Sequence, residues 1–446
     1  MQSKSSLVRL GFCTLVAPFF DHTYAQTHYD SICSTLRDLP GVELCEPGGP
    51  LSSEELVDEA ARAFRADRPD ALVLLMGTFT SGELPMRIAE SCDGPLGLWA
   101  FREPALDDSV GLNSLCGVNL LSFTLKAMGR NYRFWYGGPH DDRVYADIAR
   151  FVRAVGAIKQ MRESRIGYVG GRAPGFYPCL YDEIKLRRIL GAEVLTVGLS
   201  EVLRYKTSLL ESAPENGRAG LPTIEGGVLG TAKSARQSRS FETLKRFVEA
   251  RRFDALTIRD WPELLDDPDL DGVWPAIGRL HDELVLTGPE GDMFGTVTMM
   301  IENYLTGEKP FLCDMIDFDA RDNSVVLWHY GAPESLARSP QQVRYSEDNT
   351  EVEFTLPEGP ITLARLRETN AGYEMLIVEG EVLPDEMHLR RAAARVRMEC
   401  DAENLLHEII YGGWPHHVCA IHGSQASAAD LREFCALKDI KVVSPR

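Results

Sequence analysis

Short apolar runs alternate with amphipathic segments over the first part of the chain. Four runs have the length and composition of buried strands: residues 7–15, 42–45, 71–76 and 96–99. Apolar residues at helical spacing predict helices over 24–37 and 52–65, and the second carries a Ser-x-x-Glu capping pattern at Ser52 and Glu55. Such alternation is typical of right-handed βαβ units. We therefore expect a Rossmann-like parallel-sheet domain over residues 1–160.

A second cycle of the same kind begins near Arg165. Three runs predict strands: residues 166–169, 192–197 and 253–258. The segments 181–190 and 241–251 have helical spacing, and a long helix over 141–162 links the two cycles. We expect a second Rossmann-like domain over residues 161–312.

The pattern changes after about Asp314. Short strands are separated by Gly, Pro and Asn turns: residues 323–329, 351–354, 361–366 and 375–378. Helices are predicted near 402–410 and 427–437. The fold class is thus α/β, with two Rossmann-like domains followed by a C-terminal β-rich, barrel-like domain over residues 313–446.

Composition narrows the classes of partner. The 446 residues carry a net charge of −19, which argues against nucleic acid and anionic membrane surfaces as partners. The ten cysteines are scattered, without a Cys-x-x-Cys pair, as in a protein of a reducing compartment. Residues 1–6 are polar and lead directly into a strand, with no leader pattern, and no apolar run reaches the ~18 residues of a membrane span. We expect a cytoplasmic protein.

Two carboxylates, Glu290 and Asp292, lie between an apolar strand at 284–286 and an apolar helical run at 295–305. Open α/β sheets bind ligands at such strand-to-helix junctions. The alternative interpretation is an acidic helix start, which the helix dipole favours.

A further carboxylate, Asp314, ends the strand-like run that starts at Phe311, and Asp317 and Asp319 follow on alternate positions. A carboxylate at a strand end is well placed to bind a cation, whereas an acidic turn is the plainer alternative. We expect one of the three to point inward and the others to be solvated.

Histidines gather near the C-terminus. His416, His417 and His422 follow a Gly/Pro-rich turn within seven positions. In a strand His416 and His417 would point to opposite faces, so at most one should bind a given ion. His329 ends the strand at 325–328 and is a weaker candidate, since a lone histidine is more often a packing residue.

Carboxylates and an imidazole from three separate segments suit Mn²⁺ or Mg²⁺ better than structural zinc. A catalytic ion keeps positions open for substrate, where it polarises a carbonyl or hydroxyl oxygen. No organic cofactor is predicted, because the glycines after residue 167 lack the spacing of a dinucleotide loop.

Three motifs, in this order and at these distances, resemble the L-fucose/L-arabinose isomerase family, particularly its shorter members: Glu290-Gly-Asp-x-x-Gly295, Val326-Leu-Trp-His329 and Gly413-Trp-Pro-His-His417. The resemblance implies that Glu290, Asp314 and His416 are metal ligands and that Glu290 and Asp314 are the catalytic acid/base carboxylates. It also implies Mn²⁺, or another divalent cation such as Mg²⁺ or Co²⁺, and a homo-oligomer, trimeric or hexameric, with sites near subunit interfaces.

The function predicted in this way is a metal-dependent aldose–ketose isomerase of carbohydrate metabolism that acts on an open-chain sugar through an enediol(ate). Asp260 and the Gly288–Pro289 pair depart from the family pattern near the expected substrate site. One alternative is therefore an isomerase of a sulfonated or phosphorylated hexose, with the anion bound by an arginine: Arg102, Arg172 or Arg259. An alternative of another class is a non-catalytic sugar-binding or regulatory protein.

Overall fold

The computed structural model describes residues 7–106, 109–212, 232–283, 285–346, 351–385, 387–423 and 426–445. The polar segment 1–6, on which the expectation of no leader depended, lies outside these residues. The chain divides between Lys159 and Gln160 into two compact units. Each unit is described by itself. Among the described helices, none is long and apolar enough to cross a membrane.

The first unit is built on a parallel five-stranded sheet with the order β2-β1-β3-β4-β5. Its strands are β1 (Val8–Leu15), β2 (Val42–Cys45), β3 (Ala71–Met76), β4 (Leu96–Ala100) and β5 (Tyr132–Tyr136). Its helices are α1 (His22–Arg37), α2 (Glu54–Asp67), α3 (Glu83–Ala89), α4 (Ser114–Ala127) and α5 (Asp142–Glu163), the last of which runs across the division. Helices α2, α3 and α4 pack on one face of the sheet, and α1 and α5 pack on the other.

The predicted strands and helices of this unit are present, and β3 is buried along its whole length. Helix α2 begins later than the capping pattern indicated. Ser53, not Ser52, is the N-cap, because Ser53 has the extended backbone and its side chain accepts from the backbone N–H of Leu56. The sequence pattern did not identify β5 or α3. The exposed aromatic positions of β5 hide its alternation.

A second parallel sheet, with the order β7-β6-β8-β9, begins the other unit. Its strands are β6 (Arg165–Val169), β7 (Glu193–Val197), β8 (Ala255–Ile258) and β9 (Leu286–Gly288). Its helices are α6 (Glu183–Ile189), α7 (Leu199–Ser212), α8 (Ala232–Arg251), α9 (Val273–Glu283) and α10 (Met293–Thr306). Strand β9 lies about two residues beyond its predicted position, since α9, which was not predicted, occupies the chain up to Glu283.

The C-terminal part forms a nine-stranded mixed sheet. Its strands are β10 (Phe311–Asp319), β11 (Ser324–His329), β12 (Arg344–Tyr345), β13 (Val352–Thr355), β14 (Gly359–Glu368), β15 (Tyr373–Val382), β16 (Ala392–Met398), β17 (His417–His422) and β18 (Lys441–Val443). Pairing of β15 with β16 closes six antiparallel strands, β16-β11-β10-β17-β14-β15, into a barrel, as the sequence predicted. Helices α11 (Ala402–Gly412) and α12 (Ala426–Lys438) accompany it.

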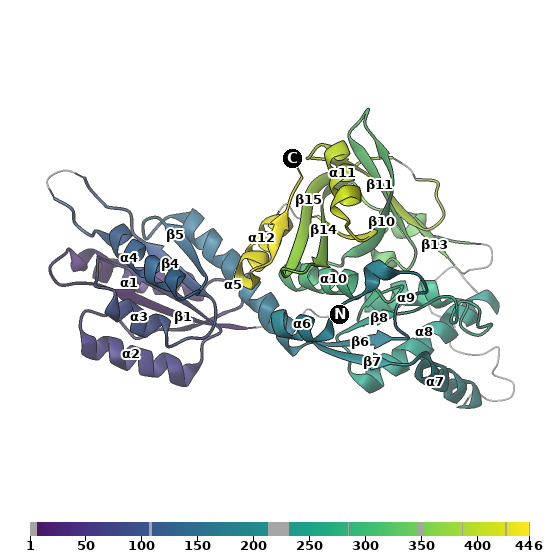
Figure 1. Ribbon diagram of the computed structural model, residues 1–446, viewed down its shortest axis with the longest axis horizontal. Helices are drawn as coiled ribbons and strands as arrows, with labels where there is room; N and C mark the ends of the chain where they lie inside the picture. Colours follow the sequence, from purple (N-terminus) through teal and green to yellow (C-terminus); the bar gives the residue numbers. More distant parts are fainter. Residues whose placement is uncertain are drawn as a thin grey trace. The chain divides into compact units, whose positions relative to one another are not determined.

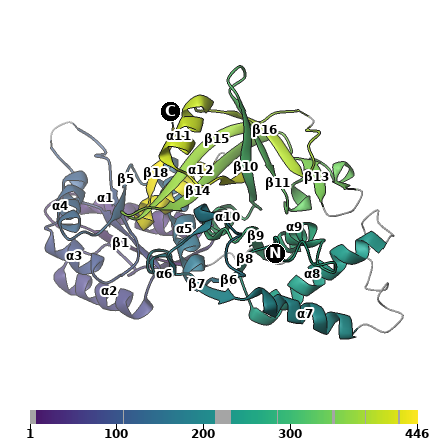
Figure 2. The ribbon, with the colours of Figure 1, turned by 45° about the vertical axis from the view of Figure 1, so that its right-hand side comes forward.

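Helix α10 lies between this barrel and the sheet of β6–β9 (Figure 1). It contacts β8 and β9 on one side and β10, β14 and β17 on the other, and nearly all of its residues are buried. The turned view in Figure 2 shows the same layering. The N-terminal end of α10 is therefore the point where the end of β9 meets the barrel strands.

Candidate metal centre

Glu290 lies in the turn between β9 and α10 and has a left-handed backbone, with φ of 63°. Its backbone N–H donates to Asp260 Oδ1 at 2.7 Å, and its carbonyl accepts from the N–H of Ala173 at 3.0 Å. A left-handed backbone is uncommon in a residue with a Cβ, so these two bonds hold a conformation that the chain would otherwise avoid. The side chain is directed toward the barrel.

The carboxylate of Glu290 is surrounded by donors. Oε1 accepts from the Tyr330 hydroxyl at 3.1 Å and from the Trp261 indole at 3.4 Å. Oε2 lies 3.3 Å from His416 Nε2 and 3.5 Å from His417 Nε2. Burial opposes ionisation, but the hydrogen bond from His416 and the neighbouring imidazoles outweigh it and lower the pKa of Glu290 to about 2. Glu290 is therefore ionised at neutral pH.

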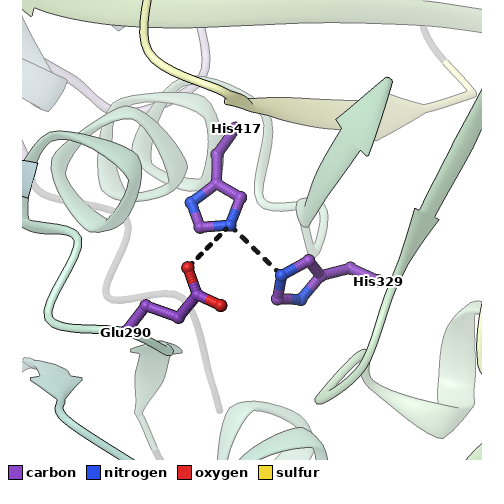
Figure 3. A group of neighbouring side chains, drawn as sticks. All are labelled: Glu290, His329 and His417. Atoms are coloured by element: carbon purple, nitrogen blue, oxygen red, sulfur yellow. Dashed lines mark hydrogen bonds and ion pairs between the residues drawn. The ribbon is translucent and has the colours of Figure 1, made fainter. Parts of the chain in front are cut away.

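Two buried imidazoles face one another beside this carboxylate (Figure 3). His417 Nδ1 lies 2.8 Å from Asp292 Oδ2, and His329 Nδ1 lies 2.8 Å from the Tyr330 carbonyl. Both partners only accept, so we assign the proton of each ring to Nδ1. The two Nε2 atoms are then left 3.1 Å apart.

The surroundings shift the pKa values of His329 and His417 in opposite directions. Burial lowers the pKa of His329 to about 3. Burial also acts on His417, but the hydrogen bond to Asp292 and the negative charge of that carboxylate raise the pKa of His417. The surroundings of His417 thus favour one positive charge at this position, either a proton on the ring or a cation bound in its place.

Asp314 approaches from strand β10, where it pairs in register with His417 on β17 and with Trp328 on β11. Asp314 Oδ1 lies 3.8 Å from His417 Nε2. This oxygen is buried and has no hydrogen-bond donor in the described part of the chain. Burial raises the pKa of Asp314. An orphaned buried carboxylate oxygen costs free energy unless something positive sits beside it.

The structure brings together the three site residues predicted from sequence. Ligand atoms of Asp314, His416 and His417 lie within 4.8 Å of one another, as do those of Glu290, His329 and His417. The expectation that His416 and His417 point to opposite faces was wrong. Strand β17 begins only at His417, so strand alternation does not apply to His416, and the two ring centroids are 4.0 Å apart.

Four other candidates are not in these two groups of ligand atoms. Asp319 pairs with Arg321, and His422 Nε2 contacts the carbonyl of Glu358. Asp317 is exposed on β10, which agrees with the expectation that only one of these aspartates points inward. Arg102 belongs to the first unit, where its guanidinium lies over the Tyr136 ring.

Asp292 combines both interpretations of its motif. It is the N-cap of α10, accepting from the N–H of Gly295 at 3.0 Å, as an acidic helix start should. It also binds His417 and forms a two-point ion pair with Arg365. Burial opposes its ionisation, yet the Arg365 charge holds the pKa of Asp292 well below its usual range. Sequence reasoning missed Arg365, although an arginine within the apolar run 361–366 signals a buried acidic partner.

Residues 13–162 match the family described as fucose/sulfoquinovose isomerase, N-terminal domain. Three similar curated proteins are all named sulfoquinovose isomerase. The one from Alkalicoccus urumqiensis is 27% identical over 388 residues, covering 84% of this chain and 86% of the relative. That from Priestia megaterium is 26% identical, covering 84% and 85%, and that from Clostridium sp. (strain MSTE9) is 24% identical, covering 93% and 94%.

Among solved structures, a sugar-bound periplasmic solute binding protein of an ABC transporter from Actinobacillus succinogenes is 10% identical. The match covers 68% of this chain and 84% of the solved chain, with a TM-score of 0.18. A similarity this low does not support the sugar-binding alternative. The family match and the curated relatives support an aldose–ketose isomerase. The chain is thus similar to the fucose/sulfoquinovose isomerase family over residues 13–162 and to curated sulfoquinovose isomerases over most of its length, which confirms the resemblance found in its sequence motifs.

Proposed function

We propose that this chain is a divalent-cation-dependent isomerase that interconverts the aldose and ketose forms of a sulfonated hexose. We infer the cation from the convergence of two carboxylates and three imidazoles at the junction of sheet and barrel. We infer the substrate class from the curated relatives reported above, all of which are named for sulfoquinovose, a sulfonated sugar.

The donor set fits a cation on its own chemistry. Asp314 Oδ1 is buried without a donor in the described part of the chain. The Nε2 lone pairs of His329 and His417 face each other and repel unless a positive species lies between them. Glu290 and Asp314 supply oxygen, and the imidazoles supply nitrogen, a set that suits Mn²⁺, Mg²⁺ or Co²⁺. Mn²⁺ is the ion we propose.

The ligands we propose are Glu290, Asp314 and imidazoles of the cluster. His416 is the imidazole expected from the sequence motif, and its side chain is about one-third exposed. Two observations favour His417 over it, with His329 as a further ligand. Both rings are buried, and each has its Nδ1 tied to an acceptor, which is how proteins usually aim a metal-binding histidine. His416 then lies on the open side of the site, where it can contact the sugar.

The reaction moves one proton between carbon atoms and one between oxygen atoms. A bound cation would polarise the carbonyl and the adjacent hydroxyl oxygen of the open-chain sugar. One of the carboxylates, Glu290 or Asp314, takes the proton from C2 and returns it to C1. The other transfers the hydroxyl proton from O2 to O1, so that the aldehyde becomes a hydroxyl as the ketone forms. The aromatic side chains of Trp261 and Phe176 border this space beside His416 and limit the access of water.

Two arginines are the candidates for holding the sulfonate. Arg172 follows β6 and Arg259 follows β8, both at the carboxyl ends of parallel strands, where α/β sheets bind ligands. In the described part of the chain, Arg172 stacks on Tyr177 and has no carboxylate partner. Arg259 pairs with Glu263 but leaves its buried Nε without a partner there.

These arginines lie close to the Glu290 turn. Ala173, which follows Arg172, donates to the carbonyl of Glu290, and Ile258, which precedes Arg259, accepts from the N–H of Gly291. An anion bound by the arginines would therefore sit on the sheet side of the site. In a chain with a net charge of −19, such local positive charge is what recognition of a sulfonate requires.

The test uses purified protein, Mn²⁺ and four sugars: sulfoquinovose, a phosphorylated aldohexose, L-fucose and L-arabinose. We expect turnover of sulfoquinovose that EDTA removes and Mn²⁺ restores, and no measurable turnover in Glu290→Gln. Arg172→Gln and Arg259→Gln should raise KM for sulfoquinovose with little change in kcat. Undiminished turnover in Glu290→Gln would overturn the catalytic assignment, and turnover of the neutral sugars alone would overturn the sulfonated substrate.

The cytoplasmic location and the homo-oligomeric assembly, trimer or hexamer, are part of the same proposal. All ten cysteines are free thiols, as is usual in a reducing compartment. Exposed apolar side chains on the first unit, among them Leu115, Phe123 and Phe134, are the kind of surface that subunit contacts cover. Analytical ultracentrifugation of the full chain would measure the assembly directly.

A further inference from the structure

Asp260 is a fully buried carboxylate that the reaction described above does not use. It follows β8 and has no exposed surface. Its Oδ1 accepts from the backbone N–H of Glu290 at 2.7 Å, and its Oδ2 accepts from the indole N–H of Trp274 at 2.7 Å. The Tyr330 hydroxyl lies beside this carboxylate. A buried carboxylate with neutral partners is expensive, so its presence calls for a reason.

The backbone of Glu290 supplies that reason. Its φ of 63° is followed by a φ of 71° at Gly291, so two successive residues are left-handed. Glycine adopts this conformation freely, but glutamate does not. The bond to Asp260 Oδ1 is made by the N–H of the strained residue itself. The backbone conformation of Glu290 sets the direction in which its side chain leaves the chain. The hydrogen bond to Asp260 therefore fixes the direction from which the Glu290 carboxylate enters the site.

The second oxygen of Asp260 connects to the aromatic group that holds the carboxylate end of Glu290. Tyr330 stacks between the rings of Trp274 and His329, with centroids 4.3 Å away on both sides. The Tyr330 hydroxyl donates to Glu290 Oε1 at 3.1 Å. Asp260 therefore contacts the backbone N–H of Glu290 directly. It also accepts from Trp274, whose ring stacks on Tyr330, and Tyr330 donates to the Glu290 carboxylate.

We propose that Asp260 is a positioning residue that holds the left-handed turn of Glu290 and, with Trp274 and Tyr330, fixes the direction of the Glu290 carboxylate. The proposal rests on the proposed function only in taking Glu290 as a working group of the site. Asp260 touches neither the sugar nor the cation; it acts through Glu290.

The geometry gives an unusual double-mutant test. Both partners of the Asp260 oxygens, the Glu290 N–H and the Trp274 indole N–H, are donors. In Asp260→Asn one end of the side chain becomes an NH₂ group, so one of these donors must face another donor. Replacing Trp274 by Phe removes the indole donor. The amide oxygen can then accept from Glu290, while the NH₂ group points to the ring position and the Tyr330 oxygen.

The experiment compares the wild type, Asp260→Asn, Asp260→Leu, Trp274→Phe and the double variant Asp260→Asn/Trp274→Phe. For each, kcat and KM for sulfoquinovose and the Kd for Mn²⁺ are measured. Asp260→Asn and Asp260→Leu should lower kcat and weaken Mn²⁺ binding by about 10- to 100-fold, the usual effect of losing a group that orients a ligand. KM should change much less, because the sugar contacts remain.

The double variant should recover about ten-fold or more of the kcat lost in Asp260→Asn, since its donor–donor conflict is gone. Asp282→Asn is the matched control: this carboxylate also accepts from two residues, Lys309 and Ser335, but neither belongs to the site. It should leave kcat and the Kd for Mn²⁺ unchanged. Thermal unfolding of every variant establishes that it is folded.

Two outcomes overturn the proposal. One is an Asp260→Leu protein that is folded and retains wild-type kcat and Mn²⁺ affinity. The other is a double variant whose fold-loss in kcat equals the product of the fold-losses in the two single variants. Independent effects of this kind would mean that Asp260 and Trp274 do not act through one hydrogen-bond network. Failure of the proposed function would look different: the wild type itself would lack Mn²⁺-dependent turnover.

Discussion

Arg365 and Asp292 form an ion pair in which both side chains are excluded from solvent, with two contacts of 2.6 and 2.9 Å. The same carboxylate binds His417 Nδ1. Arg365 therefore acts on the candidate centre without touching it, because its charge keeps Asp292 ionised and so fixes the tautomer and direction of the His417 ring.

Arg365→Met should destabilise the protein strongly. Removing one partner leaves the Asp292 carboxylate buried without its countercharge, which costs about 3–5 kcal/mol. Urea unfolding measures this loss. Arg432→Met is the control, since Arg432 pairs with Glu379 at the surface and such pairs contribute at most about 1 kcal/mol. Equal losses in the two variants would contradict the prediction.

Gly295→Ala should destabilise the protein although it lies in α10, where alanine is normally favoured over glycine by about 1 kcal/mol. A Cβ at this position would lie 2.6 Å from Asp292 Oδ2 and 2.9 Å from Arg365 Nη1. We expect a loss of about 1–3 kcal/mol in the free energy of unfolding, as for other overpacked sites. Gly82→Ala is the comparison, because the nearest atom there, on Leu120, is 3.7 Å away, and its effect should be small.

Substitution of the neighbouring histidines should separate a ligand from a substrate contact. His417→Asn should weaken Mn²⁺ binding by at least about ten-fold, measured by calorimetry. His416→Asn should mainly raise KM for the sugar, because that ring is partly exposed and its Nδ1 is not tied to Asp292. If instead His416→Asn lost the ion and His417→Asn retained it, the ligand assigned from the sequence motif would be the correct one.

Addition of Mn²⁺ should raise the unfolding temperature of the wild type. A ligand that binds only the folded state at 100 times its Kd adds about 2.7 kcal/mol. Glu290→Gln should reduce this shift, and EDTA should reverse it. A wild-type protein whose unfolding temperature does not respond to Mn²⁺, Mg²⁺ or Co²⁺ would speak against a cation at this centre.

Acid sensitivity should arise in part from His281, a buried residue of α9 that belongs to neither group of candidate metal ligands. Burial lowers the pKa of His281 from 6.5 to about 4, with Asp282 and Lys309 acting in opposite directions. Between these values the unfolded chain binds more protons than the folded one. Stability is therefore lost as the pH falls from 6.5 toward 4.

For one group the loss is about 1.4 kcal/mol per pH unit below 6.5, or about 2 kcal/mol at pH 5.0. Urea unfolding of the wild type and of His281→Leu at pH 7.5, 6.0 and 5.0 measures it. The variant should lose less stability over this range than the wild type does. The same pH dependence in both proteins would show that His281 is not the group responsible.

Much of the fold follows from local patterns. The run at β3 is apolar throughout because both faces of that strand are covered, and the barrel was expected from short strands separated by turns. What could not be predicted depends on pairing between distant segments. Closure by β15 and β16 is one example, since no local signal marks which strands of a sheet meet. The exposed aromatic side chains of β5 likewise concealed a strand.

The site shows the same division. Glu290 and the histidine cluster were recognisable because rare residue types crowd into turns. Strand alternation predicted that at most one of His416 and His417 binds the ion, and the resemblance selected His416. The start of β17 shows why the alternation rule does not apply to His416. Asp260 stood out merely as a departure from the family pattern. Its bond to the N–H of Glu290 depends on where β8 and β9 end relative to each other, which no spacing along the chain records.

The position of α10 between sheet and barrel has a consequence for folding. Glu290 belongs to the sheet side and His417 to the barrel side, 127 residues further along the chain. An ion held by both would act as a removable cross-link that closes this long loop, and it would favour the docked arrangement over any state in which the layers separate. Ion affinity would then report on the docking of the two layers, and a variant that loosens their contact anywhere along α10 would be detected first as weaker binding of the ion.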